Sequence, residues 1–183
     1  MILSASQDNS RRIVLFFIQP TILTDIYCRK SCIFESCIFI GVIDMMVFEE
    51  NTMTVEQYLH LRQRVHWKPL TQPQAQKALD NSLYVLAAYH DGELVGMGRL
   101  VGDGAVICYI QDLIVLPDIQ SRGSGSMIID RLIAYAASLG FPGTTMMLDL
   151  MCARGREAFY QKHGFIARPN DELGPGMIQY LEI

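Results

Sequence analysis

"LIVLPDIQSRGSGSMIIDRLI", residues 113–133, joins an apolar, strand-like run to an apolar, helix-like run through a loop of small residues. The start of a helix presents unpaired N–H groups and a partial positive charge, so phosphates bind there readily. Gly123 and Gly125 keep side chains away from that backbone and permit unusual φ angles. Ser121, Ser124 and Ser126 add hydroxyl donors, and Arg122 adds a positive charge. The stretch therefore predicts a phosphate-binding loop, or phosphate cradle, that follows a buried strand.

Two familiar phosphate loops fit this stretch poorly. A Walker loop requires a lysine after its second glycine, and the stretch contains none. A dinucleotide-binding fingerprint requires a third glycine or alanine where Ile128 stands, and residues 117–120 separate the strand from the loop. A helix whose start is merely glycine-rich, with no ligand, stays open as an alternative.

The flanking sequence predicts the elements around this loop. Alternating or β-branched runs indicate strands, apolar residues at helical spacing indicate helices, and Asp91-Gly92 and Asp103-Gly104 indicate tight turns. The expected order is a strand at 46–51, helices at 54–67 and 71–82, strands at 83–90, 93–102 and 105–116, a helix at 124–138, a strand at 144–151, a helix at 154–163 and a strand at 177–183. This order predicts an α/β protein with a mixed sheet whose first half is antiparallel.

Residues 1–45 differ from the rest of the chain and are predicted to be an extension outside a domain formed by 46–183. They contain Cys28, Cys32 and Cys37, and no clear periodicity runs through them. The cysteine spacing fits no CxxC metal pair, and "SRRIVLFF" only vaguely resembles an export signal. A start codon placed too early would also explain the segment.

Composition excludes several classes of protein. The chain has 183 residues, enough for one domain, and a net charge of −4, which argues against a broad nucleic-acid surface. No apolar run reaches the roughly 18–20 residues of a membrane helix. Five cysteines, an odd number, favour reduced thiols and a cytoplasmic location. We expect no nucleic-acid partner, no membrane and no metal.

Two motifs together point to a family. Leu113, Val115, Pro117, Gln120, Gly123 and Gly125 match the pattern L-x-V-x-P-x-x-Q/R-x-x-G-x-G/A, and "EAFYQKHGF", residues 157–165, follows at the expected distance. Over about residues 46–183 the chain resembles the GNAT (Gcn5-related N-acetyltransferase) superfamily. The resemblance implies a mixed, mostly antiparallel sheet flanked by helices, with central parallel strands near 109–116 and 145–151 that splay apart.

The resemblance also implies acetyl-CoA as co-substrate and a set of residues to bind it. The pantetheine would pair with the backbone of 113–115, and the pyrophosphate would lie on the N–H groups of 121–126. Backbone near Leu113 and Ile114 would polarise the thioester carbonyl. The expected cofactor-binding residues are Leu113, Ile114, Val115, Gln120, Ser121, Arg122, Gly123, Ser124, Gly125 and Ser126.

The implied catalytic residues are Tyr160 and Asp112. Tyr160 occupies the tyrosine position of the second motif and would protonate the leaving sulfur; a core aromatic is the alternative. Asp112 precedes the L-x-V strand end and would act as base if burial raised its pKa. A hydrogen-bonded strand carboxylate at a sheet bulge is its alternative, with Asp149 or an ordered water as other candidates for the base.

Other residues near the second motif carry weaker expectations. Ala153 stands where many members have asparagine, so Arg154 and Arg156 are candidates to replace that contact by reaching the phosphates; solvated helix arginines are the alternative. We expect Cys152 to be buried and His163 to lie on the helix surface. His66 and Trp67 are candidates to wall the acceptor pocket, with packing in the core or on the surface as the alternative. The polar loop at 167–177 is a candidate to close over that pocket, with a plain connecting loop as the alternative.

The expected reaction is transfer of an acetyl group to the primary amine of a small molecule. Direct attack in a ternary complex needs no covalent enzyme intermediate. A protein or peptide acceptor and a non-catalytic acyl-CoA-binding module remain alternatives. A homodimer is possible because the superfamily often forms them.

Overall fold

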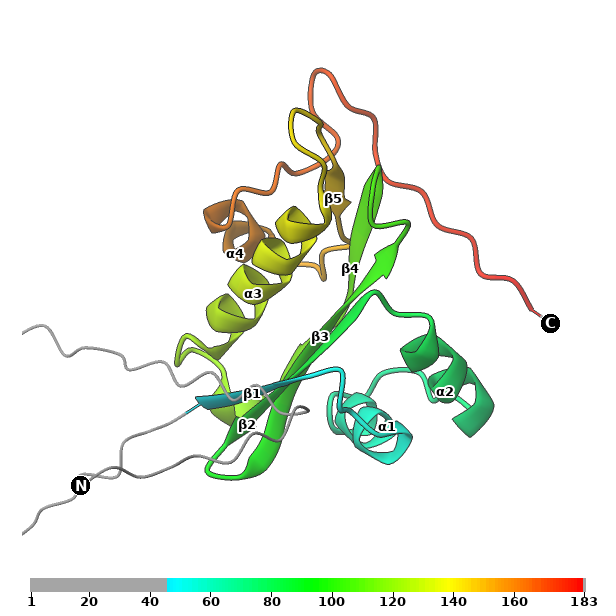
Figure 1. The fold of residues 1–183 in the computed structure, drawn as a ribbon, viewed down its shortest axis with the longest axis vertical. Coiled ribbons are helices and arrows are strands. Elements are labelled where there is room, and N and C mark those ends of the chain that lie inside the picture. Colours follow the sequence, from blue (N-terminus) through cyan, green and yellow to red (C-terminus); the bar gives the residue numbers. More distant parts are fainter. Residues whose placement is uncertain (1–45, 183) are drawn as a thin grey trace, which may run out of the picture.

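The computed structural model describes residues 46–182 (Figure 1). The predicted extension at 1–45 lies outside the described residues. Ten elements follow one another along the chain. They are β1 (Met46–Glu50), α1 (Val55–Arg64), α2 (Gln72–Asp80), β2 (Tyr84–His90), β3 (Glu93–Gly102), β4 (Ile107–Val115), the short 3-10 turn η1 (Pro117–Ile119), α3 (Ser124–Leu139), β5 (Met147–Asp149) and α4 (Glu157–Lys162).

The strands form one sheet in the order β1-β2-β3-β4-β5. The first three pairings are antiparallel, and only β4 and β5 run parallel. That parallel pairing covers three positions, Ile107 with Met147 through Tyr109 with Asp149. Along residues 110–115, β4 therefore continues without a strand partner on its β5 side, within the sheet that residues 46–182 form. The predicted mixed, mostly antiparallel sheet with a splayed parallel pair is confirmed, but the pair lies at one edge of the sheet formed by residues 46–182 and not at its centre.

A bulge in β4 lies beside this splay. Gln111 faces Arg99 on β3 and Ile114 faces Met97, so two residues of β4 fall opposite one residue of β3. Asp112, one of those two, has a φ of 56°. The extra residue reverses the alternation of side chains: Ile110 packs on the α3 side of the sheet, whereas Ile114 packs on the α1 side.

Helices cover both faces of the sheet (Figure 1). On one face, α3 packs its Ile128, Ile129 and Leu132 against strand residues such as Leu86 and Leu100, all completely buried. The other face carries α1 and α2 over a smaller core, formed by Tyr58, Leu61, Ala75, Val85, Met97, Ile114 and Leu116. Helices thus pack against both faces of the sheet as far as the bulge in β4.

Local sequence explains where α1 and α2 begin. Thr54 caps α1 by accepting a hydrogen bond from the N–H of Gln57, whose side chain accepts from the N–H of Thr54. Thr71 and Gln74 repeat this capping box at α2, where Pro73 occupies the first turn. Helix α3 differs, because no side chain caps its start at Gly123.

Two predicted elements differ from the structure. The strand expected at 144–151 is reduced to the three residues of β5. The strand expected at 177–183 is wrong over the described residues, because 177–182 lie in no strand. A strand requires a hydrogen-bonded neighbour as well as a suitable sequence, and Figure 1 shows the chain's end running away from β5. No helix within 46–182 is both long and apolar enough to cross a membrane.

Candidate active site

The predicted phosphate cradle forms the start of α3. Gly123 takes a left-handed φ of 87°, and Ser121 has a φ of 65°. A Cβ added at Gly123 would meet no atom within 4 Å, so the position requires glycine for its backbone angle rather than for space. With no side-chain cap, the N–H groups of the first turn of α3 stay available to a ligand.

Gly125 has a packing role that the sequence did not reveal. A Cβ at this position would lie 3.4 Å from Cζ of Phe159 and 3.8 Å from Cγ2 of Val115. These are ordinary van der Waals distances, so an alanine would fit here and a larger side chain would meet Phe159. This contact places the tyrosine motif of α4 beside the free edge of β4.

The three serines of the loop have different surroundings. Ser124 is buried, and its hydroxyl lies 3.5 Å from the carbonyl oxygen of Ile119. The Ser126 hydroxyl lies 3.2 Å from Nε2 of His163. Ser121 is exposed, as is Arg122. Among the serine hydroxyls, only that of Ser121 is left fully on the surface of the loop.

Gln120 and Arg156 connect the loop to both neighbouring elements. The Gln120 amide donates to the carbonyl of Val115 at 2.8 Å, and Arg156 Nη2 donates to Gln120 Oε1 at 3.4 Å. Arg156 therefore holds its positive charge beside the loop. A guanidinium carries several donors, so this contact leaves others free.

The expectation that His163 lies on the helix surface is wrong. Its side chain is 13% exposed, and its Nδ1 lies 2.8 Å from Oδ1 of Asp130 on α3. The ring of Phe159 lies against it with centroids 5.0 Å apart. The close approach of α3 and α4 encloses the imidazole between the two helices.

Asp112 lies at the centre of a buried polar cluster. Its carboxylate accepts hydrogen bonds from Arg99 Nε at 2.7 Å, Arg62 Nη1 at 2.8 Å and Gln111 Nε2 at 3.1 Å, and a further one from the Tyr58 hydroxyl. The side chain of Asp112 is completely buried. The cluster ties the β4 bulge to α1 and β3.

These contacts overturn the expected pKa of Asp112. Burial alone raises the pKa of this carboxyl, but hydrogen bonds from Tyr58 and Arg99, with the charge of Arg99, outweigh burial and lower it. A carboxylate with a low pKa and four donors is a poor proton acceptor. Asp112 is therefore the hydrogen-bonded carboxylate at the bulge.

The partners of Asp112 were not identified from the sequence. Tyr58 and Arg62 lie one turn apart on α1, and Arg99 lies within the otherwise apolar strand β3. An arginine inside an apolar strand needs an acidic partner, because a charge is rarely buried alone. That requirement was the available signal for an Arg99–Asp112 pair.

Asp149 has the opposite environment. It ends β5 and lies beside Tyr109, at the point where β4 and β5 separate. Its Oδ1 is buried and has no hydrogen-bond partner among the described residues. Burial raises the pKa of this carboxyl, and the charge of Arg168 opposes the rise only in part. The raised pKa and the free oxygen are the properties expected of a general base.

Tyr160 lies on α4, partly buried against the larger core. Its ring meets that of Phe159 edge-on, with centroids 5.0 Å apart, and that of Phe165 at 6.0 Å. Burial and the neighbouring Cys152 raise the pKa of the hydroxyl, with Arg156 opposing them. The phenol thus stays protonated at neutral pH, as an acid must. Cys152, expected to be buried, is exposed.

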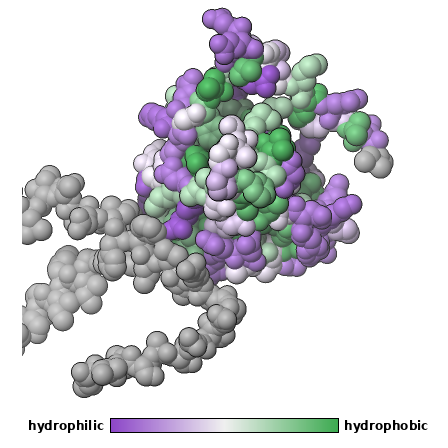
Figure 2. All heavy atoms as spheres, turned by 45° about the horizontal axis from the view of Figure 1, so that its top comes forward, coloured by the Kyte–Doolittle hydropathy of each residue, from purple (hydrophilic) through white to green (hydrophobic). Residues whose placement is uncertain are grey.

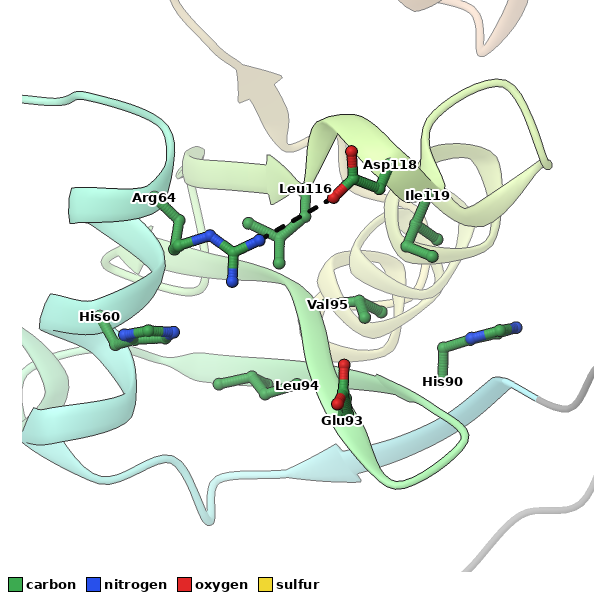
Figure 3. Close-up of a pocket in the computed structure, with 9 residues that line it drawn as sticks. All are labelled: His60, Arg64, His90, Glu93, Leu94, Val95, Leu116, Asp118 and Ile119. Atoms are coloured by element: carbon green, nitrogen blue, oxygen red, sulfur yellow. Dashed lines mark ion pairs between the residues drawn. The ribbon is translucent and has the colours of Figure 1, made fainter.

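A hollow of about 370 Å³ lies away from the splay, on the α1 side of the sheet (Figure 3). Arg64 and Asp118 face each other across it with nitrogen and oxygen 4.0 Å apart. Its lining is of mixed charge: His60, Arg64, His90, Glu93, Leu94, Val95, Leu116, Asp118 and Ile119. The ring centre of Trp67, a residue expected at the acceptor pocket, lies 5.2 Å from the guanidinium of Arg62.

Residues 46–182 contain no group of three acidic, histidine or cysteine side chains able to hold a metal.

Comparison with known proteins gives consistent results. Residues 47–165 match the family model described as "Acetyltransferase (GNAT) family". An uncharacterised N-acetyltransferase ycf52-like protein of Prochlorococcus marinus is 26% identical over 142 residues, covering 74% of this chain and 77% of that protein. GCN5-related N-acetyltransferase 3 of Arabidopsis thaliana, a chloroplastic protein, is 31% identical over 75 residues, which span 41% of this chain and only 30% of that protein.

A solved structure shares the fold and part of the sequence. It is a protein of unknown function from meticillin-resistant Staphylococcus aureus, described as a probable acetyltransferase, with a TM-score of 0.65 and 29% identity. The similarity covers 74% of this chain and all of the solved chain.

Proposed function

This chain belongs to the GNAT family of acetyltransferases, and we propose that it transfers the acetyl group of acetyl-CoA to the primary amine of a small molecule. The observation that carries the proposal is the free edge of β4 along residues 110–115, which is followed, after η1, by the uncapped start of α3. A free strand edge accepts an extended polar chain, and an uncapped helix start accepts phosphate.

The pantetheine arm of acetyl-CoA is proposed to pair with the backbone of Leu113, Ile114 and Val115. The unpaired edge of β4 supports this, because its N–H and C=O groups there have no strand partner on the β5 side. The pyrophosphate would lie on the first turn of α3, with Arg122 and Arg156 as the nearby cations. Gly123 supports this role through its left-handed backbone, and Gln120 by bracing the loop.

Asp149 is proposed to act as the general base of the reaction and Tyr160 as the general acid. Asp149 accepts a proton from the acceptor ammonium, and the free amine attacks the thioester carbonyl. The attack forms the C–N bond and a tetrahedral oxyanion, which backbone N–H groups beside the bulge would stabilise. Collapse of this intermediate breaks the C–S bond, and Tyr160 gives its proton to the departing sulfur, so the products are an amide and free CoA thiol. The second proton of the amine and the proton held by Asp149 leave to solvent, which also reprotonates Tyr160.

Asp112 receives a different role in this proposal. Its four hydrogen bonds fix the backbone of the bulge, and with it the direction of the N–H groups at Leu113 and Ile114. It is therefore a positioning residue. This assignment replaces the expected role of Asp112 as general base.

A screen of primary amines with the full chain tests the proposed reaction. Free CoA is measured with a thiol reagent in the presence of acetyl-CoA and either small amines or peptides with free N-termini. We expect CoA release with at least one small amine and its loss in Tyr160→Phe. Release with peptides alone would overturn the acceptor class. A well-folded chain that binds acetyl-CoA but releases no CoA with any amine would favour a binding module.

A further inference from the structure

An aspartate, a histidine and a serine form a hydrogen-bonded chain where α3 and α4 meet. His163, at the end of α4, has its Nδ1 2.8 Å from Oδ1 of Asp130 and its Nε2 3.2 Å from Oγ of Ser126. Ser126 and Asp130 lie one turn apart on α3, so both side chains reach the same neighbour. We name these three residues the α3–α4 relay.

The imidazole of the relay is enclosed between the two helices. Its side chain is 13% exposed, whereas that of Asp130 is 64% exposed. The ring of Phe159 packs against it from α4, where Lys162 is the adjacent cation. Among residues 46–182, Asp130 provides the only carboxylate within 4.0 Å of its nitrogens. The contact thus has an apolar and a polar side, the mixture of hydrophobic and hydrophilic residues that Figure 2 shows over one face of the molecule.

The aspartate fixes which nitrogen of the neutral imidazole carries the proton. An ionised carboxylate only accepts hydrogen bonds, so Nδ1 of His163 must donate to Asp130. In the neutral ring, Nε2 is then an acceptor, and the Ser126 hydroxyl donates to it. In the protonated ring, both nitrogens donate, and the Ser126 oxygen accepts instead. The charge of the imidazole therefore decides where the hydroxyl proton of Ser126 points.

Ser126 belongs to the first turn of α3, at the phosphate cradle. The N–H of Met127 donates to the carbonyl of Gly123 at 3.0 Å, and this is the first hydrogen bond of the helix. The N–H of Ser126 precedes it, so it is one of the uncapped groups that face a ligand. The hydroxyl of the same residue is the link between the cradle and the relay.

We propose that His163 directs the Ser126 hydroxyl and thereby makes the binding of acetyl-CoA depend on pH. This inference rests on the proposed function, because it requires the pyrophosphate to lie at the start of α3. With a neutral imidazole, the hydroxyl proton is given to Nε2, and only oxygen lone pairs face the phosphate. With a protonated imidazole, Nε2 donates to the Ser126 oxygen and the hydroxyl proton turns to a phosphate oxygen. His163 is thus a positioning residue for the cofactor.

The sign of the pH dependence follows from these two states. The protonated relay offers the phosphate one more donor and a nearby positive charge, so acetyl-CoA binds it more tightly. Affinity should fall as the pH rises through the range in which histidine side chains lose their proton, about pH 5 to 8. One hydrogen bond to a charged group corresponds to a change of roughly tenfold in affinity. By reciprocity, binding should take up protons from the buffer within that range.

The test is calorimetric titration of the full chain with acetyl-CoA at about pH 6 and about pH 8. We expect the wild-type dissociation constant to rise roughly tenfold between them, relative to the change in His163→Leu. At the higher pH, His163→Leu should bind at least as tightly as the wild type, because nothing competes for the Ser126 hydroxyl. His60→Leu, which removes an exposed histidine of α1, should keep the wild-type profile. The 3′-phosphate of CoA also titrates, at a pH of about 6, so profiles are compared between proteins.

A second variant separates the hydroxyl from the charge of the imidazole. Ser126→Ala should lose the pH dependence and bind about as weakly as the wild type does at the higher pH. If Ser126→Ala keeps the wild-type dependence, the charge acts without the hydroxyl and the relay is refuted. Parallel profiles for the wild type and His163→Leu overturn this inference and leave the proposed function intact. A wild type that binds no acetyl-CoA at either pH overturns both.

Discussion

Two aspartates on neighbouring strands have opposite environments, and their substitution should have opposite effects. Asp112 is completely buried with four donors, whereas Asp149 has a buried oxygen without a partner among the described residues. Replacing a paired carboxylate leaves Arg62 and Arg99 without their counter-charge. Replacing Asp149 removes only a carboxylate that burial disfavours.

Asp112→Asn should lower the free energy of unfolding by about 3–5 kcal/mol, the usual effect of breaking a buried ion pair. Urea unfolding at neutral pH measures this. Asp118→Asn is the matched control, because Asp118 is 85% exposed and lies 4.0 Å from Arg64, so its effect should stay within about 1 kcal/mol. Equal effects of the two substitutions would contradict the positioning role of Asp112.

The lowered pKa of Asp112 also sets a pH dependence. A carboxyl whose pKa is lower in the folded protein than in the unfolded one stabilises the fold above its unfolded pKa, near 4. That stabilisation is lost as the pH falls through the lower, folded pKa. Wild-type stability should therefore drop in acid, and Asp112→Asn should show a shallower drop. Parallel acid-unfolding curves for the two proteins would oppose this account.

Asp149→Asn should separate activity from stability. The pKa of Asp149 is raised in the folded protein, so its ionised form opposes folding once the pH exceeds that pKa. The asparagine variant should thus be at least as stable as the wild type at neutral pH, while turnover falls by about 10²-fold or more. Initial rates and thermal midpoints measure the two effects. A variant that keeps wild-type turnover would exclude Asp149 as the base.

At the scale of elements, the contact of α3 with α4 depends on Gly125. A Cβ there would lie 3.4 Å from Cζ of Phe159, which is still ordinary van der Waals contact, so alanine fits and a branched side chain does not. Gly125→Val should destabilise the protein by about 1–3 kcal/mol, as overpacking does, whereas Gly125→Ala should cause no such loss. Phe159→Leu in the Gly125→Val chain should recover part of the loss, as thermal unfolding will show. An unchanged midpoint in Gly125→Val would mean that the helices are not held this closely.

Gly123 tests the start of α3 in a different way, because its backbone angle, and not the space around it, restricts which residues can replace it. Gly123→Ala meets no neighbour within 4 Å but must adopt a left-handed conformation, at a cost of about 1–2 kcal/mol. Asparagine tolerates that conformation better, so Gly123→Asn should be the milder substitution in urea unfolding. The reverse order would show that space, and not the angle, selects glycine.

Across the whole molecule, hydrophobic periodicity and turn-forming residues correctly predicted the strands and helices whose own sequence marks them. Thr54 marked the start of α1, and Asp91-Gly92 marked the β2–β3 turn. Features that depend on tertiary pairing escaped prediction. Residues 177–182 have a strand-like sequence but no neighbouring strand, and the pKa of Asp112 is lowered by partners on α1 and β3, which are distant in sequence. The site motifs were identified by resemblance, whereas their packing around Gly125 and His163 required the structure.

The measurement that tests the central claim most directly is thermal unfolding of the full chain with and without acetyl-CoA. A ligand that binds only the folded state raises its stability by about 2.7 kcal/mol at one hundred times its dissociation constant. We predict a clear rise of the midpoint with acetyl-CoA, and a smaller rise in Arg156→Ala. A folded chain whose midpoint does not move at millimolar acetyl-CoA would contradict the proposed binding along β4 and the start of α3.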